Sequence, residues 1–239
     1  MNTTNDIATL LHGNPYPGRG IVIGNSEDGT KACTAYFIMG RSENSRNRIF
    51  VLKNGELSTA PFDESKVEDP RLIIYTAVKQ VENNLIVTNG DQTDTIAAAL
   101  GSGISFADAL KTRKFEPDKP HFTPRISGML TFENGSFHYQ MSILKSADSE
   151  GSACERFFFS YPALPGTGHL IHTYACDGNP LPSFYGEPKA VKIDNDMQRF
   201  ADTLWHALDE KNKISLFVRY VDLGTLESKE LIFNKQEQI

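Results

Sequence analysis

Short apolar runs separated by turn residues predict a β-rich protein. The runs span about five to eight residues and are interrupted by Gly, Pro and Asn. In the first half of the chain the predicted strands are residues 20–24, 32–39, 48–52, 72–81 and 85–88. In the second half they are residues 126–132, 137–144, 157–161, 170–174, 214–220 and 230–233. Three connections carry hairpin chemistry: Glu82-Asn83-Asn84, Glu133-Asn134-Gly135 and residues 222–228.

Two segments show the helical period instead. Residues 195–211 place six apolar side chains on one face, after an N-cap expected at Asp194 or Asn195: Met197, Phe200, Ala201, Leu204, Trp205 and Leu208. We interpret this stripe as core packing. Residues 93–110 are rich in Ala and broken at Gly101-Ser102-Gly103, which predicts two short helices. Strands around two helical layers indicate an α+β fold of stacked sheets flanked by helices, in one domain of residues 1–239.

Composition narrows the class of protein. Of the 239 residues, 39% are hydrophobic and 23% are charged, which is typical of a globular chain and excludes a disordered one. The formal net charge of -6 provides no global positive field for nucleic acid. Cys33, Cys154 and Cys176 are widely spaced, so neither a disulfide framework nor a metal site is predicted. No signal peptide or apolar run of membrane-spanning length is visible, so we expect a cytoplasmic protein with no membrane partner.

The first segment that suggests chemistry is the loop of residues 40–48, which directly follows a predicted strand. It holds three arginines, Arg41, Arg46 and Arg48, separated by Ser and Asn. Guanidinium groups bind phosphate or carboxylate through two hydrogen bonds at once, so the loop suits an anionic ligand. The alternative is a solvated loop whose arginines pair with surface acids.

The second segment, residues 88–96, runs from a strand through a polar turn into a helix. Backbone N–H groups at such a turn suit an anionic or amide-bearing ligand, and Asn89, Asp91 and Asp94 surround it. The alternative is helix capping, with Asp91 or Thr93 as the cap. Ligand binding and helix capping can both be true of this turn.

The third segment, residues 115–125, contains three prolines that stiffen a loop. It presents Glu116, Asp118, His121 and Arg125. Glu116 or Asp118 would serve as a general acid or base if burial desolvated it. The alternative is a salt bridge or a helix cap. A fourth segment, residues 173–188, is aromatic and rich in Pro and Gly. We interpret it either as the wall of a pocket or as a connection on the protein surface.

Taken in order, these segments resemble the archaeal-type inosine monophosphate (IMP) cyclohydrolases and their bacterial relatives. The resemblance rests on GRSENSRNR (40–48), DPRLIIY (69–75), TNGDQTDTI (88–96), FEPD…TPRI (115–126) and DGNPLPSFYGEP (177–188). It implies a four-layer αββα sandwich similar to that of the N-terminal-nucleophile hydrolases. The implied reaction closes the second purine ring of 5-formamidoimidazole-4-carboxamide ribotide to give IMP and water. It implies a small ribonucleotide substrate, no cofactor and a homo-oligomer.

The resemblance also suggests roles for individual residues. Arg41 and Arg48 are expected to anchor the phosphate, with Arg46 and Arg125 as further candidates. Tyr75 would donate to the formyl oxygen or assist proton transfer, and Glu116 would be the acid/base. Further substrate-binding candidates in the matching blocks are Asn89, Asp91, Asp94 and Asp118.

Two other hypotheses remain open at this stage. One is an amide hydrolase of the N-terminal-nucleophile type that uses Cys33, which would require removal of the first thirty-two residues. The other is a purine-nucleotide-binding module without catalysis. Residues 1–18 and 146–168 exceed the compact archaeal form, and a longer relative can keep the ribotide site while acting on another nucleotide.

Overall fold

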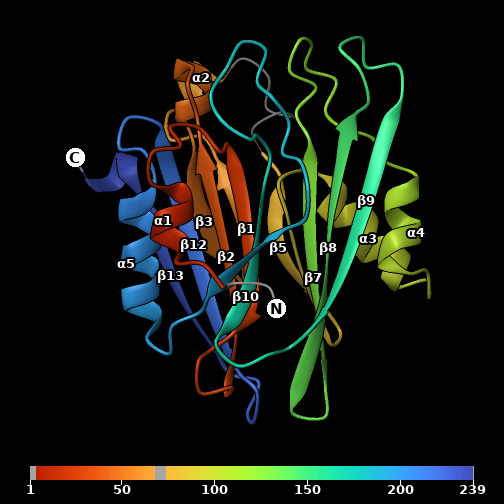
Figure 1. Cartoon of the computed structure of the whole chain (residues 1–239), viewed down its shortest axis with the longest axis vertical. Coiled ribbons are helices and arrows are strands. Elements are labelled where there is room, and N and C mark those ends of the chain that lie inside the picture. Colours follow the sequence, from red (N-terminus) through yellow and green to blue (C-terminus); the bar gives the residue numbers. More distant parts are fainter. Residues whose placement is uncertain (1–3, 68–73, 239) are drawn as a thin grey trace.

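The computed structural model describes residues 4–67 and 74–238, and within them two antiparallel sheets stack face to face (Figure 1). Sheet A runs in the order β11-β10-β1-β2-β12-β13. Its strands are β1 (Arg19–Asn25), β2 (Lys31–Met39), β10 (Thr167–His172), β11 (Lys189–Lys192), β12 (Lys213–Asp222) and β13 (Ser228–Asn234). Sheet B runs in chain order from β3 to β9. Its strands are β3 (Ile49–Lys53), β4 (Glu56–Ala60), β5 (Thr76–Val81), β6 (Asn84–Thr88), β7 (Arg125–Glu133), β8 (Ser136–Ser146) and β9 (Cys154–Pro162).

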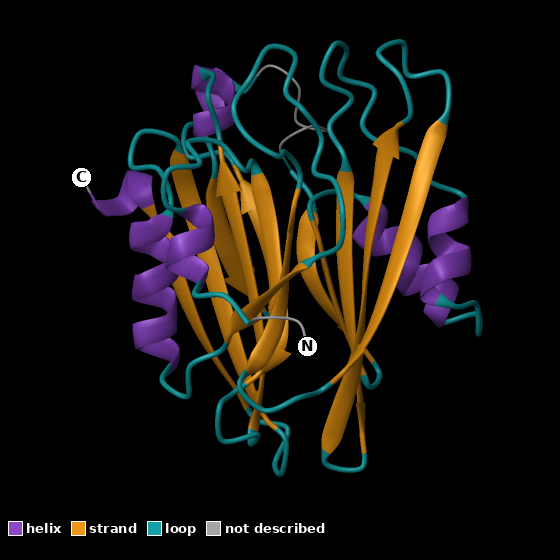
Figure 2. Ribbon diagram, in the orientation of Figure 1, coloured by secondary structure: helices purple, strands orange, loops and turns teal. Residues whose placement is uncertain are grey.

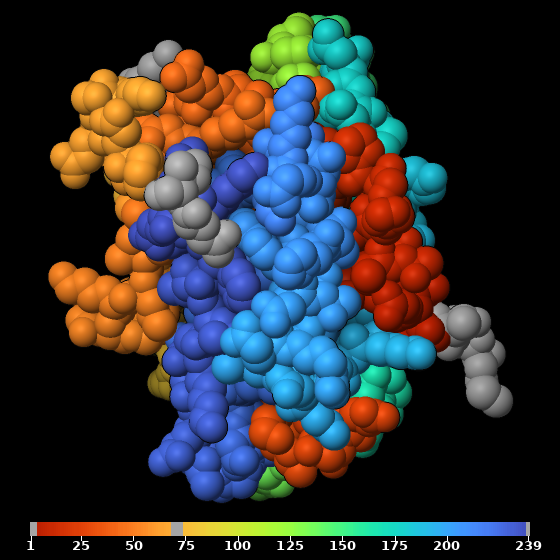
Figure 3. Space-filling model, turned by 90° about the vertical axis from the view of Figure 1, so that its left-hand side faces the viewer, coloured from red at the N-terminus to blue at the C-terminus, as the bar shows by residue number. Residues whose placement is uncertain are grey.

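Helices cover the outer faces of both sheets (Figure 2). α1 (Ile7–Leu11) and α5 (Met197–Ala207) lie side by side on sheet A, as Figure 3 also shows. α3 (Gln92–Leu100) and α4 (Phe106–Lys111) lie on sheet B. The loop between β2 and β3 contains the single turn α2 (Glu43–Arg46), and short 3-10 turns occupy Glu64–Lys66 and Lys235–Gln238. The α+β prediction, with stacked sheets flanked by helices, is confirmed.

Three apolar clusters hold these layers together, and β2 shows why its sequence reads as one apolar run. Tyr36 and Ile38 face the core between the sheets, whereas Phe37 and Met39 face the cluster beneath α1 and α5. Successive side chains of a strand point to opposite faces, so a strand covered on both faces must be apolar throughout.

Most predicted elements occur in the structure within a few residues of their expected bounds. The hairpin turns between β5 and β6, β7 and β8, and β12 and β13 are confirmed. The two-helix interpretation of residues 93–110 is confirmed by α3 and α4, and the helix of residues 195–211 by the shorter α5. The N-cap of α5 is Asp196, not Asp194 or Asn195 as predicted. The side chain of Asp196 accepts a hydrogen bond from Arg199 N. Residues 72 and 73 of one predicted strand lie outside the described residues.

β4, β11 and the short helices α1 and α2 were not predicted from the sequence. β4 carries only two fully buried side chains, Leu57 and Thr59, and β11 is four residues long. Neither gives a long enough alternation to be recognised. In the described part of the chain, no helix is long and apolar enough to cross a membrane.

Several strands of both sheets begin or end at the same end of the sandwich, the end near α2. Arg19 begins β1 opposite Ile38 near the end of β2, and Met39 lies opposite Lys213 at the start of β12. In sheet B the same end holds Thr88 at the end of β6 and Arg125 at the start of β7. Loops 40–48 and 115–124 leave from here, so their polar side chains converge over the core.

Candidate functional site

Two tyrosines join the sheets at this end of the core. Tyr36 of β2 and Tyr75, next to β5, place their hydroxyl oxygens 2.7 Å apart. The backbone of Tyr75 is held by Thr59, whose hydroxyl accepts from Tyr75 N at 3.1 Å. Burial raises the pKa of both phenols, so both are neutral at physiological pH. One O–H donates to the other oxygen, and the second O–H is available to a ligand.

Arg19 and Arg48 bring positive charge to the same place. Arg48 is 2% exposed, and its Nε donates to Ser45 O at 2.8 Å. Its Nη2 and the Nε of Arg19 are buried without a hydrogen-bond partner among residues 4–67 and 74–238. Burial lowers the pKa of Arg48, and the charge of Arg19 lowers it further. Buried unpaired donors are rare in proteins, so this pair is prepared for an acceptor.

Glu116 faces these charges from the proline-stiffened loop. Its backbone N–H donates to Thr123 O at 2.9 Å. Burial raises the pKa of the Glu116 carboxyl, although Arg19 and Arg125 act in the opposite direction. A carboxyl with a raised pKa exchanges protons nearer to neutral pH than an ordinary one. Glu116, Arg19, Arg48, Tyr36 and Tyr75 are called the polar cluster below.

Gly90 explains how the strand-to-helix turn fits beside the polar cluster. A Cβ at Gly90 would lie 2.6 Å from Arg125 Nη1 and 3.6 Å from Glu116 Oε1. A contact of 2.6 Å is far inside van der Waals distance, so any larger residue at position 90 would displace Arg125 from its place beside Glu116. The absence of a side chain at Gly90 therefore leaves room for Arg125 to lie beside Glu116.

The turn of residues 88–96 is held by two buried amides. Asn89 Oδ1 accepts from Ile126 N at 2.9 Å, and its Nδ2 donates to Pro124 O at 2.9 Å. Gln92 Nε2 donates to Asn89 Oδ1, and Gln92 Oε1 accepts from Arg125 Nη1 at 2.6 Å. Both amides therefore fix the turn to β7 and aim Arg125.

Asp91 stands at the N-cap position of α3 but makes no side-chain cap hydrogen bond. Its carboxylate pairs with Arg113 at 2.5 Å and Arg125 at 2.6 Å. Asp94 lies further along α3, with its side chain 69% exposed and 3.8 Å from Lys79. Asp91 thus supports Arg125, whereas Asp94 is directed away from the polar cluster.

Asp118 supports the other side of the site through a chain of hydroxyls. Its carboxylate accepts from the backbone N–H of Thr123 at 2.6 Å and from the Thr123 hydroxyl. Thr123 Oγ1 lies 2.6 Å from the hydroxyl of Tyr174, which stacks on Tyr16 with ring centroids 5.8 Å apart. Burial raises the pKa of Tyr174 to about 12. Its phenol is therefore neutral and donates to Thr123.

Arg41 and Arg46 belong to the loop of residues 40–48, called the arginine loop from here on, and point in different directions. Arg41 Nη1 donates to Asp177 Oδ1 at 2.6 Å and to Gly178 O at 2.9 Å, and its guanidinium lies 5.1 Å from the Tyr16 ring centroid. Arg46 instead donates to Gly40 O at 3.0 Å and Asn212 Oδ1 at 3.1 Å. Arg41 borders the polar cluster through Tyr16, and Arg46 braces the loop.

Among the residues selected from the sequence, the structure therefore brings Arg48, Tyr75 and Glu116 together, with Arg125 beside Glu116. The sequence analysis missed Arg19 and Tyr36. The signal for Tyr36 was its single phenol within the apolar run of β2, and the signal for Arg19 was a charge that immediately precedes a buried strand.

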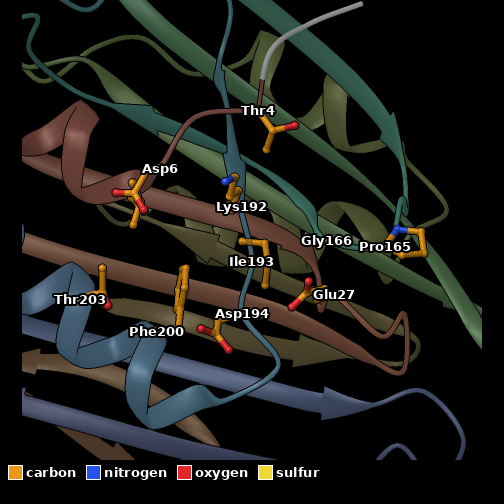
Figure 4. A pocket seen from close by; sticks show the side chains of 11 residues that line it. Thr4, Asp6, Glu27, Pro165, Gly166, Lys192, Ile193, Asp194, Phe200 and Thr203 are labelled. Carbon is orange, nitrogen blue, oxygen red and sulfur yellow. The ribbon is translucent and has the colours of Figure 1, made fainter.

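A separate pocket of about 510 Å³ lies on the outer side of sheet A, between α1 and α5 (Figure 4). Asp6, Glu27 and Asp194 lie along it, but the carboxylate of Asp194 is paired with Arg199 and Asp6 caps α1. Among residues 4–67 and 74–238, no three His, Cys, Asp or Glu side chains are grouped to hold a metal ion.

Comparison with known proteins assigns the chain to a family. Residues 16–225 match the family of IMP cyclohydrolase-like proteins, a span that contains the whole polar cluster. An IMP cyclohydrolase of Methanopyrus kandleri is 32% identical over 182 residues, 71% of this chain and 89% of that protein. One from Methanococcus maripaludis is 32% identical over 163 residues, 65% of this chain and 79% of its own length. One from Methanococcus aeolicus is 28% identical over 165 residues, 67% and 75% of the two chains. The chain belongs to the family of IMP cyclohydrolase-like proteins.

Proposed function

We propose that this protein closes the ring of 5-formamidoimidazole-4-carboxamide ribotide to form IMP. The observation that carries the proposal is the family match over residues 16–225. Within that span, the polar cluster combines two unpaired guanidinium nitrogens, two neutral phenols and one carboxyl of raised pKa. These are the groups that an intramolecular condensation needs.

The reaction forms one bond and releases one water. The carboxamide nitrogen attacks the formyl carbon, and its proton passes to the formyl oxygen to give a hydroxyl. That hydroxyl leaves as water with the proton of the formamido nitrogen, and a C=N bond remains. Both reacting groups belong to one imidazole, so the substrate itself supplies their proximity. The protein must stabilise the developing oxyanion and move two protons.

The polar cluster fits both tasks. The free O–H of the Tyr36–Tyr75 pair donates to the formyl oxygen, and the charges of Arg19 and Arg48 stabilise the oxyanion as it forms. Glu116 takes the proton from the attacking nitrogen and delivers it to the formyl oxygen, which becomes the hydroxyl. It then takes the proton of the formamido nitrogen and delivers it to that hydroxyl, which leaves as water. Its raised pKa brings the carboxylate closer in basicity to the groups with which it exchanges.

We assign the phosphate to Arg41, and Arg48 to the oxyanion. The side chain of Arg41 is 34% exposed, and the Asp177 carboxylate already occupies an anion position on it. Arg125 and Asp118 orient the site beside Glu116. Asn89 and Asp91 contribute through the turn that they hold, and Asp94 and Arg46 are assigned no contact with the ribotide.

We also propose that the layers correspond to the αββα sandwich of the N-terminal-nucleophile hydrolases, in one domain of residues 1–239. By the same resemblance, the enzyme would act in the cytoplasm as a homo-oligomer. Hydrolysis through Cys33 is disfavoured because that thiol is completely buried in the apolar cluster under α5, and burial raises its pKa. Tyr36, on the same strand, faces the opposite side of sheet A.

The test is a turnover assay with the formyl ribotide in the presence of EDTA, with IMP followed by chromatography and absorbance. We expect conversion well above the uncatalysed rate. Tight binding of IMP without conversion would replace the proposal by the non-catalytic nucleotide-binding module. Release of formate without IMP would indicate an amide hydrolase instead.

A further inference from the structure

The two arginines of the polar cluster, half-buried Arg19 and buried Arg48, come from different segments, and their like charges repel. Arg19 follows the N-terminal segment that carries Pro15 and Tyr16, whereas Arg48 ends the arginine loop. In the part of the chain that the structure describes, neither Arg19 Nε nor Arg48 Nη2 has a hydrogen-bond partner. The pairing of β1 with β2 holds Arg19 opposite Ile38, and Glu116 faces both guanidinium groups. The loop that follows Met39 and carries Arg48 leaves the sheet, so its position relative to Arg19 needs a further anchor.

The turn between α5 and β12 supplies a side chain that binds both segments. Asn212 Nδ2 donates to Pro15 O at 3.0 Å, and Asn212 Oδ1 accepts from Arg46 Nη2 at 3.1 Å. The backbone of Asn212 adds a third link, because Gly40 N donates to its carbonyl at 2.9 Å. Asn212 is itself 9% exposed and is fixed by Asp209, whose carboxylate accepts from its N–H at 3.0 Å.

Arg46 connects Asn212 to the start of the arginine loop. Its Nε donates to Gly40 O while its Nη2 reaches Asn212, so the guanidinium closes the loop back onto its own start. Arg48 lies two residues further and is aimed by its bond to Ser45 O. On the other side of Asn212, Pro15 precedes Tyr16, whose ring lies under Arg41.

We propose that Asn212 is a positioning residue that sets the distance between Arg19 and Arg48 by tying the N-terminal segment to the arginine loop. The inference rests on the proposed function, because it assigns Asn212 to the geometry of that same site. Asn212 does not touch the substrate. A small misplacement of a charged group relative to the reacting atoms reduces the rate strongly, so the bridge matters although it lies outside the polar cluster.

Two substitutions separate its donor from its acceptor. Asn212→Leu removes both at similar volume, whereas Asn212→Asp keeps the acceptor for Arg46 and loses the donor to Pro15. The control is Asn83→Leu, which removes a side-chain bond to Phe132 O at the opposite end of the sandwich. For Asn212→Leu we expect the Kd for IMP to rise, and kcat/KM to fall, by about tenfold. Asn212→Asp should give a smaller change, and Asn83→Leu should stay within twofold of the unmodified protein.

The pH–rate profile distinguishes positioning from general destabilisation. Glu116 is faced by Arg19, Arg48 and Arg125 and by the carboxylate of Asp118. If Arg19 and Arg48 move away in the Leu variant, the ionisation assigned to Glu116 shifts to higher pH. A loss of stability alone leaves the profile unchanged. An unshifted profile would therefore overturn the proposal, as would a Kd and kcat/KM within twofold of the unmodified protein.

Failure of the proposal for Asn212 can be distinguished from failure of the proposed function. If the unmodified protein binds IMP without making it, the cyclohydrolase assignment fails and the Kd values alone decide the role of Asn212. If Asn212→Leu does not fold, Asn212→Asp decides, and a Kd equal to that of the unmodified protein overturns the proposal. If the unmodified protein neither forms nor binds IMP, both proposals fail.

Discussion

At the scale of single residues, Glu116 carries a conflict between function and stability. Burial raises its pKa above the ordinary value of a glutamate, so the ionised carboxylate is less favourable in the folded protein than in the unfolded chain. A raised carboxyl pKa contributes stability below the unfolded pKa, and that contribution is lost as pH rises through the folded pKa. The folded protein is therefore less stable at neutral pH than it would be with a neutral side chain at this position.

We predict that Glu116→Gln is more stable than the unmodified protein at pH 8 and that this advantage shrinks towards pH 4.5, as the Glu116 carboxyl of the folded protein becomes protonated. Urea unfolding at the two pH values measures the difference. A difference in unfolding free energy that is independent of pH would contradict the raised pKa.

The tyrosine pair makes a second prediction at this scale. Tyr36 and Tyr75 share one hydrogen bond, so only one O–H is free for substrate. Tyr75→Phe and Tyr36→Phe should each lower kcat by about 10–10³-fold, and the double variant should fall little further because the two hydroxyls act as a unit. Steady-state kinetics of the three variants test this. Strictly multiplicative losses would show that the two hydroxyls act independently.

At the scale of elements, the β7–β8 hairpin is determined by two residues with positive φ. Asn134 has φ 50° and Gly135 has φ 70°, the conformation that a two-residue hairpin turn favours. Gly135→Ala should lower the unfolding free energy by about 1–2 kcal/mol, because a Cβ is strained there although no neighbour crowds it. Chemical denaturation measures the loss, and turnover should not change because the turn lies far from the polar cluster.

Gly101 offers the matched control. It ends α3 at φ -60°, which alanine adopts without strain. Gly101→Ala should be neutral or stabilise by about 0.4–1 kcal/mol, because it reduces the freedom of the unfolded chain. Equal losses at positions 101 and 135 would mean that backbone conformation is not the cause.

Elements with strong local patterns could be predicted from the sequence, and the weaker ones could not. The stripe of α5 and the Asn134-Gly135 turn carry their own signals within a few residues. β11 has no such signal, because it forms only where β10 offers an edge. The candidate site divides in the same way. Arg48 and Glu116 stand in polar loops that attract attention, whereas Tyr36 is recognised only when Tyr75 meets it across two sheets.

At the scale of the whole molecule, the two faces of sheet A pack against different layers: one against sheet B, the other against α1 and α5. Tyr36 of β2 faces the core between the sheets and the polar cluster, while Cys33 of the same strand faces α5. An intact fold therefore hides the Cys33 thiol, whereas Cys176 is exposed.

We predict that Cys176 reacts rapidly with a thiol reagent in the native protein, and that Cys33 reacts only after unfolding. Peptide mapping after pulsed labelling assigns each thiol. Cys33→Ala should retain turnover. Its inactivity in a folded protein would restore the nucleophilic hydrolase hypothesis.

If the polar cluster performs the ring closure, loss of the Glu116 carboxylate must slow turnover while IMP still binds. IMP formation from the formyl ribotide is measured for the unmodified protein and for Glu116→Gln, with IMP binding measured by calorimetry on both. We predict rapid turnover by the unmodified protein and a loss of about 10²–10⁴-fold in kcat for the variant, which still binds IMP. Full turnover by Glu116→Gln would contradict the account, because the proton transfers would then occur somewhere else.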